Sequence, residues 1–192
     1  DPLEYRLHLL SKWDKSWSDC LRLAAEKAGW GKPLPKGEGL GIAISNWPAA
    51  AKRNAGTVVC TAVRVAVSQQ GQVKVKQVDV AFDCGRVANA DAVRAQIEGA
   101  TIMGMNMTLN EQLTIVDGVI AETNFHQYPM LRMADVPVVN VHFEALSGQE
   151  RFDIVGEAPI GPVGPAIGNA IYQALGTRVR STPVGNWDLG WG

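Results

Sequence analysis

The stretch TVVCTAVRVAVSQQGQVKVKQVDVAF, residues 57–82, contains the clearest strand pattern in the chain. Its first half is rich in β-branched residues, and Gln70-Gly71-Gln72 supplies a turn before the second half returns. Apolar residues alternate as far as Val75, after which the alternation continues one residue out of step through residues 78–82. We therefore predict a β-hairpin with a β-bulge near Lys76-Gln77.

Helical and strand patterns flank this hairpin on both sides. Helices are expected over residues 2–10, 16–28, from Asn89 or Asp91 to about 109, and 163–175. Strands are expected over residues 39–46 and 138–145. A short hairpin over residues 113–122 is expected to turn at Asp117-Gly118. Residues 49–53 would suit a helical turn. These elements predict an α+β fold in which mixed and antiparallel sheet segments pack against helices.

The chain divides into a helical lead-in over residues 1–30, a sheet-and-helix core over 39–184 and a tail over 185–192. We expect the tail to be loosely ordered unless its tryptophans dock. The methionines are expected to fill gaps in the core rather than to line a substrate pocket.

Composition and charge limit the classes of partner. Hydrophobic residues make up 46% of the 192 residues, and 18 Lys and Arg face 19 Asp and Glu, so no basic field attracts nucleic acid. No apolar run approaches the roughly 20 residues of a transmembrane helix, and the N-terminus lacks the regions of a signal peptide. We expect a soluble chain, and the absence of an initiator methionine suggests a fragment or a processed protein.

Cysteines and histidines are scattered along the chain. Cys20, Cys60 and Cys84 lack the paired short spacings of a zinc or iron–sulfur site and are expected to be buried small hydrophobes. The strand phase over residues 138–145 places His142 outward, as a solvated residue rather than a ligand. No metal site built from this chain's side chains is predicted.

Two features of the sequence stand out, a lone carboxylate and a pair of glycines within a helix. Glu157 is a single carboxylate in the stretch VGEAPIGP, residues 155–162, whose prolines and glycines can hold it rigidly near a ligand, as a catalytic base requires. A solvated glutamate in an ordinary loop is the alternative that composition leaves open. Gly99 and Gly104 weaken the helix ending near residue 109 and imply close backbone packing or the approach of a ligand.

Three segments occur in order: Asp83-Cys84-Gly85-Arg86 with Asn89, Gln96-Ile97-Glu98-Gly99 with Gly104, and Gly156-Glu157 before a small-residue helix. This pattern resembles the C-terminal part of the molybdenum-binding subunit in the xanthine dehydrogenase and aldehyde oxidase family. The likeness to the bacterial isoquinoline 1-oxidoreductase beta subunits extends over nearly the whole chain. Such subunits are several times longer, so the resemblance implies that residues 1–192 are the C-terminal portion of a molybdopterin-binding domain.

The resemblance implies a molybdopterin cofactor, often as its cytosine dinucleotide in bacteria, that holds molybdenum through its own sulfurs. Glu157 then takes the role of the base that removes a proton from a molybdenum-bound hydroxyl as its oxygen, which comes from water, attacks the substrate carbon. Gln96 and Gly156 take cofactor-binding positions; from the helix pattern alone, Gln96 is an exposed polar residue. Asp83 and Arg86 are expected to bond to each other or to nearby backbone at a strand-to-helix junction.

The resemblance also implies partners and a setting. These are the upstream part of the same large subunit, a separate small subunit carrying the iron–sulfur clusters, an aldehyde or N-heterocycle as substrate, and a bacterial cytoplasm or periplasm. Phe125, Tyr128 and Met130 are placed within reach of a substrate funnel. A second hypothesis is a non-catalytic folding or assembly module that docks the iron–sulfur subunit, motivated by the tryptophans and above all by Trp187 and Trp191.

Overall fold

The computed structural model describes residues 1–13, 15–48, 56–143, 146 and 151–192. Its main elements are α1 (Pro2–Leu10), α2 (Lys15–Ala28), β1 (Glu38–Pro48), β2 (Gly56–Val67), β3 (Val73–Asp83), α3 (Ala90–Leu109), β6 (Val139–His142) and α4 (Val163–Leu175). A small hairpin, β4 (Ile115–Val116) and β5 (Val119–Ile120), and four 3-10 turns complete the described chain. The helical turn expected over residues 49–53 lies outside the described residues, as does the end of the strand expected to reach 145.

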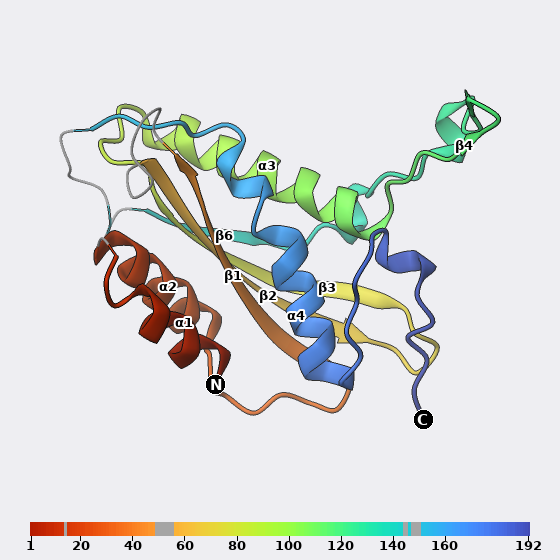
Figure 1. The fold of residues 1–192 in the computed structure, drawn as a ribbon, viewed down its shortest axis with the longest axis horizontal. Coiled ribbons are helices and arrows are strands. Elements are labelled where there is room, and N and C mark those ends of the chain that lie inside the picture. The colour runs from red at the N-terminus through yellow and green to blue at the C-terminus, as the bar shows by residue number, and fades with distance from the viewer. Residues whose placement is uncertain (14, 49–55, 144–145, 147–150) are drawn as a thin grey trace.

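One four-stranded sheet forms the centre of the molecule, in the order β1-β2-β3-β6 (Figure 1). The pairs β1–β2 and β2–β3 are antiparallel, whereas β6 joins the far side of β3 in parallel. The predicted hairpin and bulge are confirmed, because Arg64 pairs with Gln77 and Val65 with Val75, which leaves Lys76 as the extra residue. The mixed sheet and the α+β class are therefore as expected.

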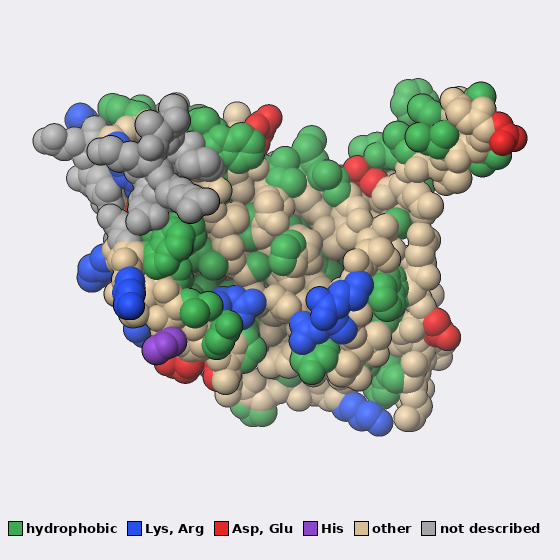
Figure 2. All heavy atoms as spheres, viewed as in Figure 1, with side chains coloured by type: hydrophobic (Ala, Val, Ile, Leu, Met, Phe, Trp, Pro, Cys, Tyr) green, Lys and Arg blue, Asp and Glu red, His purple; other side chains and the backbone are tan. Residues whose placement is uncertain are grey.

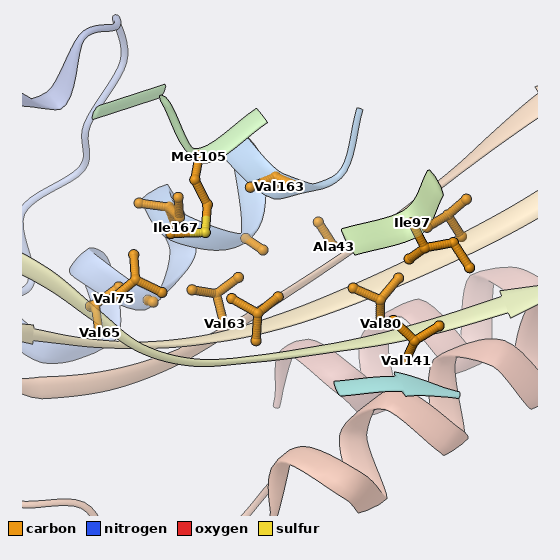
Figure 3. Packing of buried hydrophobic residues seen from close by; sticks show 14 of the residues in the cluster. Ala43, Val63, Val65, Val75, Val80, Ile97, Met105, Val141, Val163 and Ile167 are labelled. Atoms are coloured by element: carbon orange, nitrogen blue, oxygen red, sulfur yellow. The ribbon is translucent and has the colours of Figure 1, made fainter. Parts of the chain in front are cut away.

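Helices cover both faces of the sheet, α1 and α2 on one side and α3 and α4 on the other (Figure 1). Successive residues of β2 point to opposite faces, so Val59 and Val63 pack towards α3 and α4 while Cys60 packs towards α2. Figure 3 shows the larger of the two cores, in which Ile97 and Ile167 meet the valines of the sheet. The three cysteines are buried and unpaired, as the sequence predicts.

Most helix ends follow the predicted signals. The helices α1 and α4 have the predicted bounds, and Asn89 proves to be the cap of α3, since its side chain accepts a hydrogen bond from the Ala92 amide at 2.9 Å.

The two glycines of α3 differ in their surroundings. A Cβ at Gly104 would lie 3.1 Å from the Ile160 carbonyl oxygen, which confirms close packing there, whereas one at Gly99 would meet nothing within 4 Å.

The β4–β5 hairpin turns at Asp117 and Gly118, with φ of 51° and 80°, as a two-residue turn of this kind requires. It belongs to a projecting arm, residues 111–128, that stands away from the body of the protein (Figure 1). Large apolar side chains are exposed on the arm: Leu113, Ile115, Val116, Val119, Ile120 and Phe125. Figure 2 shows these hydrophobic side chains gathered on the arm.

Two expectations need revision, and a third, conditional one is decided. Of the five methionines only Met105 is in the core, and Met103, Met107, Met130 and Met133 are exposed. The solvated position of His142 is wrong: its side chain is only 21% exposed and its Nε2 lies 3.0 Å from Oδ1 of Asp79. The reason is that the second face of the sheet is also covered by helices. The loose tail is replaced by the docked alternative, since Trp191 Nε1 donates to the Val67 carbonyl at 3.0 Å and Leu189 is buried.

Within the described residues, no helix combines the length and the apolar character needed to cross a membrane.

Candidate functional site

Glu157 directly precedes a 3-10 turn, η3 (Ala158–Ile160), and its side chain is exposed. Its carbonyl oxygen accepts a hydrogen bond from the Ile160 amide at 3.1 Å. Ala158 and Pro159 are buried, and η3 packs against α3. The backbone at Glu157 is thus anchored on its C-terminal side, while the carboxylate itself points to solvent.

Gln96 lies on α3, the helix against which η3 packs, and its side chain is also exposed. Neither the Gln96 amide nor the Glu157 carboxylate makes a hydrogen bond or ion pair with another described residue. The structure therefore places the two predicted site residues on contacting elements, with both polar groups free to bind something else. The space next to Gly156 is also empty, because a Cβ built there would meet nothing within 4 Å.

Asp83 and Arg86 do not bond to each other, which corrects one of the two expected arrangements. Asp83 is bound instead to nearby backbone, accepting a hydrogen bond from the Gly85 amide at 2.9 Å, and its Oδ2 lies 3.0 Å from Nη2 of Arg151. The Arg86 guanidinium lies over the Phe152 ring, 5.9 Å from its centroid. Burial raises the pKa of the neighbouring Cys84 thiol, so that thiol stays neutral.

The residues expected near a substrate funnel line cavities that do not include Gln96 or Glu157. Phe125 and Tyr128 are on the arm, where they line a surface cavity of about 300 Å³ together with Leu113. A hydrogen bond to Glu111 raises the pKa of Tyr128. Met130 lines a different cavity of about 590 Å³ beside the end of α3. In the described chain these side chains are not gathered around Gln96 and Glu157.

Two polar clusters escaped the sequence reasoning. Asp79 is 2% exposed, accepts a hydrogen bond from Gln77 Nε2 at 2.6 Å and faces His142. Arg151 joins Asp83 from a segment 68 residues further along the chain. A carboxylate inside an apolar strand was the available signal, since buried Asp is rare without a partner.

Gln96 and Glu157 present free hydrogen-bonding groups to a bound molecule. An exposed carboxamide offers both donors and an acceptor to a polar ring system, and an exposed carboxylate offers an acceptor for a proton. Backbone around Gly99 and Gly156 is open to close approach. Among the described residues there is no group of three His, Cys, Asp or Glu side chains arranged to hold a metal ion.

Residues 22–137, well over half of the chain, match the molybdopterin cofactor-binding domain family. The chain belongs to this family. Gln96 lies inside the matched residues and Glu157 lies beyond them. The family is named for the molybdopterin cofactor.

Similar proteins extend over nearly the whole chain. The membrane-bound aldehyde dehydrogenase [pyrroloquinoline-quinone] of Gluconacetobacter polyoxogenes is 36% identical over 96% of this chain and 25% of its own length. The isoquinoline 1-oxidoreductase subunit beta of Brevundimonas diminuta is 32% identical over 96% of this chain and 23% of its own length. The chain thus spans about a quarter of these curated relatives.

A solved structure shares the fold. CO dehydrogenase from Oligotropha carboxidovorans superimposes with a TM-score of 0.61 at 15% identity, over 69% of this chain and 18% of that one. The chain is therefore a member of the molybdopterin cofactor-binding domain family and shares its fold with part of that molybdenum enzyme's chain.

Proposed function

We propose that residues 1–192 form the C-terminal portion of a molybdopterin-binding domain in a molybdenum hydroxylase that oxidises aldehydes or hydroxylates N-heterocycles, with water as the oxygen source. The observation that carries the proposal is the position of Gln96 and Glu157. Both side chains are exposed and unpartnered within the described chain, on α3 and beside η3, two elements that pack together. The membership of the family supplies the cofactor class.

When bound, molybdopterin, in its cytosine dinucleotide form, supplies the metal that accepts two electrons from the substrate. Gln96 holds the cofactor through its amide, and Gly156 lets backbone come close to it. Glu157 accepts the proton of the oxygen that attacks the substrate carbon. A general base must reach within about 2.6–3.2 Å of the atom it deprotonates, so the placement of this carboxylate decides its efficiency.

The arm supports the proposal that this chain packs against the upstream part of the same polypeptide. A two-stranded hairpin is marginal in water, and this one exposes apolar side chains on both sides, with Phe125 92% exposed. The relatives are about four times longer than this chain, which leaves ample polypeptide to cover the arm. A small subunit with the iron–sulfur clusters is proposed as the second partner, and the compartment as cytoplasm or periplasm.

The alternative function is a non-catalytic module that docks the iron–sulfur subunit through the tryptophans of the tail. Trp187 and Trp191 pack on the chain's own core, and Trp187 Nε1 donates to the Ser181 carbonyl at 3.0 Å. Both rings are thus largely engaged within the chain, which weakens the motivation for that role.

Cofactor content tests the proposal first. Molybdenum and pterin are measured by elemental analysis and extraction from this chain alone and from the chain coexpressed with its upstream region. Stoichiometric molybdenum and pterin in the longer assembly are expected. Their absence there, or the recovery of a quinone cofactor such as the one in the name of the Gluconacetobacter relative, would refute it.

The base is tested by Glu157→Gln in the complete enzyme. Removing a general base is expected to lower turnover by about 10²–10⁴-fold at unchanged molybdenum content. The matched control is Glu26→Gln, an exposed carboxylate on α2 across the sheet, which is expected to leave turnover unchanged. Turnover of the Glu157 variant within a few-fold of the parent would remove Glu157 from the mechanism.

A further inference from the structure

Residues 151–154, which lead into Gly156 and Glu157, are bound to the Asp83-Cys84-Gly85-Arg86 segment at the end of β3. The Arg86 amide donates to the Arg151 carbonyl at 2.7 Å, and the Asp153 amide donates to the Cys84 carbonyl at 3.1 Å. Between these two bonds Gly85 and Phe152 pair as an isolated antiparallel bridge. The segment is thus held by backbone hydrogen bonds on both sides of Gly85.

Gly85 is required for this approach on two grounds. Its φ of +73° lies in the left-handed region that side chains other than glycine rarely adopt. A Cβ at this position would also lie 2.3 Å from the Arg151 carbonyl oxygen. Any larger residue would push the 151–154 segment away from β3.

A buried ion pair reinforces the backbone contacts. Asp83 is 1% exposed, and its two oxygens face the Gly85 amide and the Arg151 guanidinium. The same guanidinium donates to the Gly56 carbonyl at 2.7 Å and to the Asp153 carboxylate. The single planar guanidinium of Arg151 therefore binds the end of β3, the start of β2 and the 151–154 segment at once. A lysine could not do this, because its ammonium group lacks the fixed set of donors.

Two further contacts fix the chain on either side of Glu157. The Thr57 hydroxyl donates to the Ile154 carbonyl, just before it. The buried Ala158 and Pro159 begin η3 directly after it. Only the short span 155–157 lies between the two anchors, so any loosening of the first anchor is transmitted to Glu157.

We propose that Asp83 and Arg151 are positioning residues for Glu157. Together with Gly85 they form a clamp, defined as the contacts of residues 83–86 with 151–154, that fixes where the carboxylate stands relative to Gln96 on α3. The proposal rests on the role of Glu157 as the base, but the clamp consists of this chain's own contacts and can be measured without cofactor.

Hydrogen exchange on the 192-residue chain tests the clamp. In Arg151→Met, exchange of the Arg86, Asp153 and Ile160 amides is expected to rise about tenfold or more, because a buried carboxylate has lost its charged partner. The Val67 amide, which donates to Gly37 at the far end of β2, is expected to stay protected. Unchanged exchange at residues 151–160, or an equal rise throughout the chain, would overturn the clamp.

Two further variants separate the loss of the clamp from the effect of leaving the Asp83 carboxylate buried without its charged partner. The double variant Asp83→Asn with Arg151→Met removes both charges and should still open the 151–160 segment. The control Glu38→Gln breaks the Arg64–Glu38 pair, 2.6 Å between Nη2 and Oε2, near the opposite end of the sheet, and should leave that segment protected.

The complete enzyme separates positioning from chemistry. Arg151→Lys is expected to lower kcat at unchanged KM and molybdenum content, with an exchange rate between those of the parent and Arg151→Met. If Glu157→Gln retains turnover while the clamp variants still open residues 151–160, the base assignment fails and the clamp stands as a structural anchor. A parent-like kcat in Arg151→Met, with the segment open, would overturn the positioning role.

Discussion

Gly41→Ala is expected to unfold the junction between β1 and α4. A Cβ at Gly41 would lie 2.1 Å from the Ala166 carbonyl oxygen and 2.3 Å from the Ala170 amide nitrogen, both backbone atoms of α4. Carbon and carbonyl oxygen normally approach to about 3.3 Å, so the helix must retreat by about 1 Å. Flexible side chains cannot absorb this displacement, because the clash is with the helix backbone.

The energetic cost follows from what the displacement disrupts. Overpacking of this kind costs about 1–3 kcal/mol. The retreat also stretches two hydrogen bonds at the open edge of β1, from Asn169 Nδ2 to the Ile42 carbonyl at 3.1 Å and from the Leu40 amide to the Gln173 side chain. At about 1 kcal/mol for each lost bond, the total is about 3–5 kcal/mol.

Urea unfolding followed by circular dichroism measures this loss, with Gly168→Ala as the matched control. Gly168 lies in the same helix, and a Cβ there would meet nothing within 4 Å. The control should therefore stabilise the chain by up to about 1 kcal/mol through helix propensity. A Gly41→Ala variant within 1 kcal/mol of the parent, at unchanged m-value, would refute the close-packing argument.

Three further outcomes are expected. Trp191→Ala should lower the free energy of unfolding by about 2–4 kcal/mol in the same urea assay, since it removes a packed ring and its bond to the Val67 carbonyl; a loss below 0.5 kcal/mol would mean that the tail is not docked. Burial raises the pKa of the Cys60 thiol, so this thiol keeps its proton in the folded chain at a pH where the unfolded chain has lost it. The free energy of unfolding should therefore fall as pH rises above the unfolded thiol's pKa of about 8.5, by up to about 1.4 kcal/mol per pH unit. Cys60→Ala should reduce this dependence of the free energy of unfolding on pH. Phe125→Ser on the arm should change stability by less than about 0.5 kcal/mol, yet reduce copurification with the upstream region; unchanged copurification would argue against the arm as that contact.

The predictable parts of the fold are those governed by local rules. The bulge at Lys76 follows from a phase slip in the apolar alternation, and the start of α3 from the capping side chain of Asn89. The parallel pairing of β6 with β3 joins residues about 60 positions apart, and no local signal specifies it. The position of His142 was mispredicted for the same reason, because strand phase says which face a residue occupies but not whether helices cover that face.

In the candidate site, too, only the features with a local sequence signal could be predicted, and those that depend on distant contacts could not. Gln96 follows from the resemblance alone, since an exposed glutamine on a helix is not distinctive in its own right. The prolines and glycines around Glu157 already indicate that residue, and the resemblance then implies its role as a base. Arg151 was not predicted, because its partner Asp83 lies 68 residues earlier and only the folded chain brings them together. An aspartate at the end of an apolar strand, two residues before a glycine, was the one sequence clue that a distant cation would be needed.

Exposure of Glu157 is compatible with a catalytic base awaiting its partner surface and with an ordinary solvated loop residue. The anchoring of its backbone favours the first. An ordinary surface loop gains little from ordering, whereas here a buried ion pair, a left-handed glycine and two buried residues restrain a span of only a few residues. Such restraint lowers the entropy lost when a carboxylate must meet a reacting proton in one geometry. The packing of η3 against α3 also links the segment that carries the proposed base to the helix that carries the proposed cofactor-binding amide, a connection that an ordinary solvated loop residue would not require.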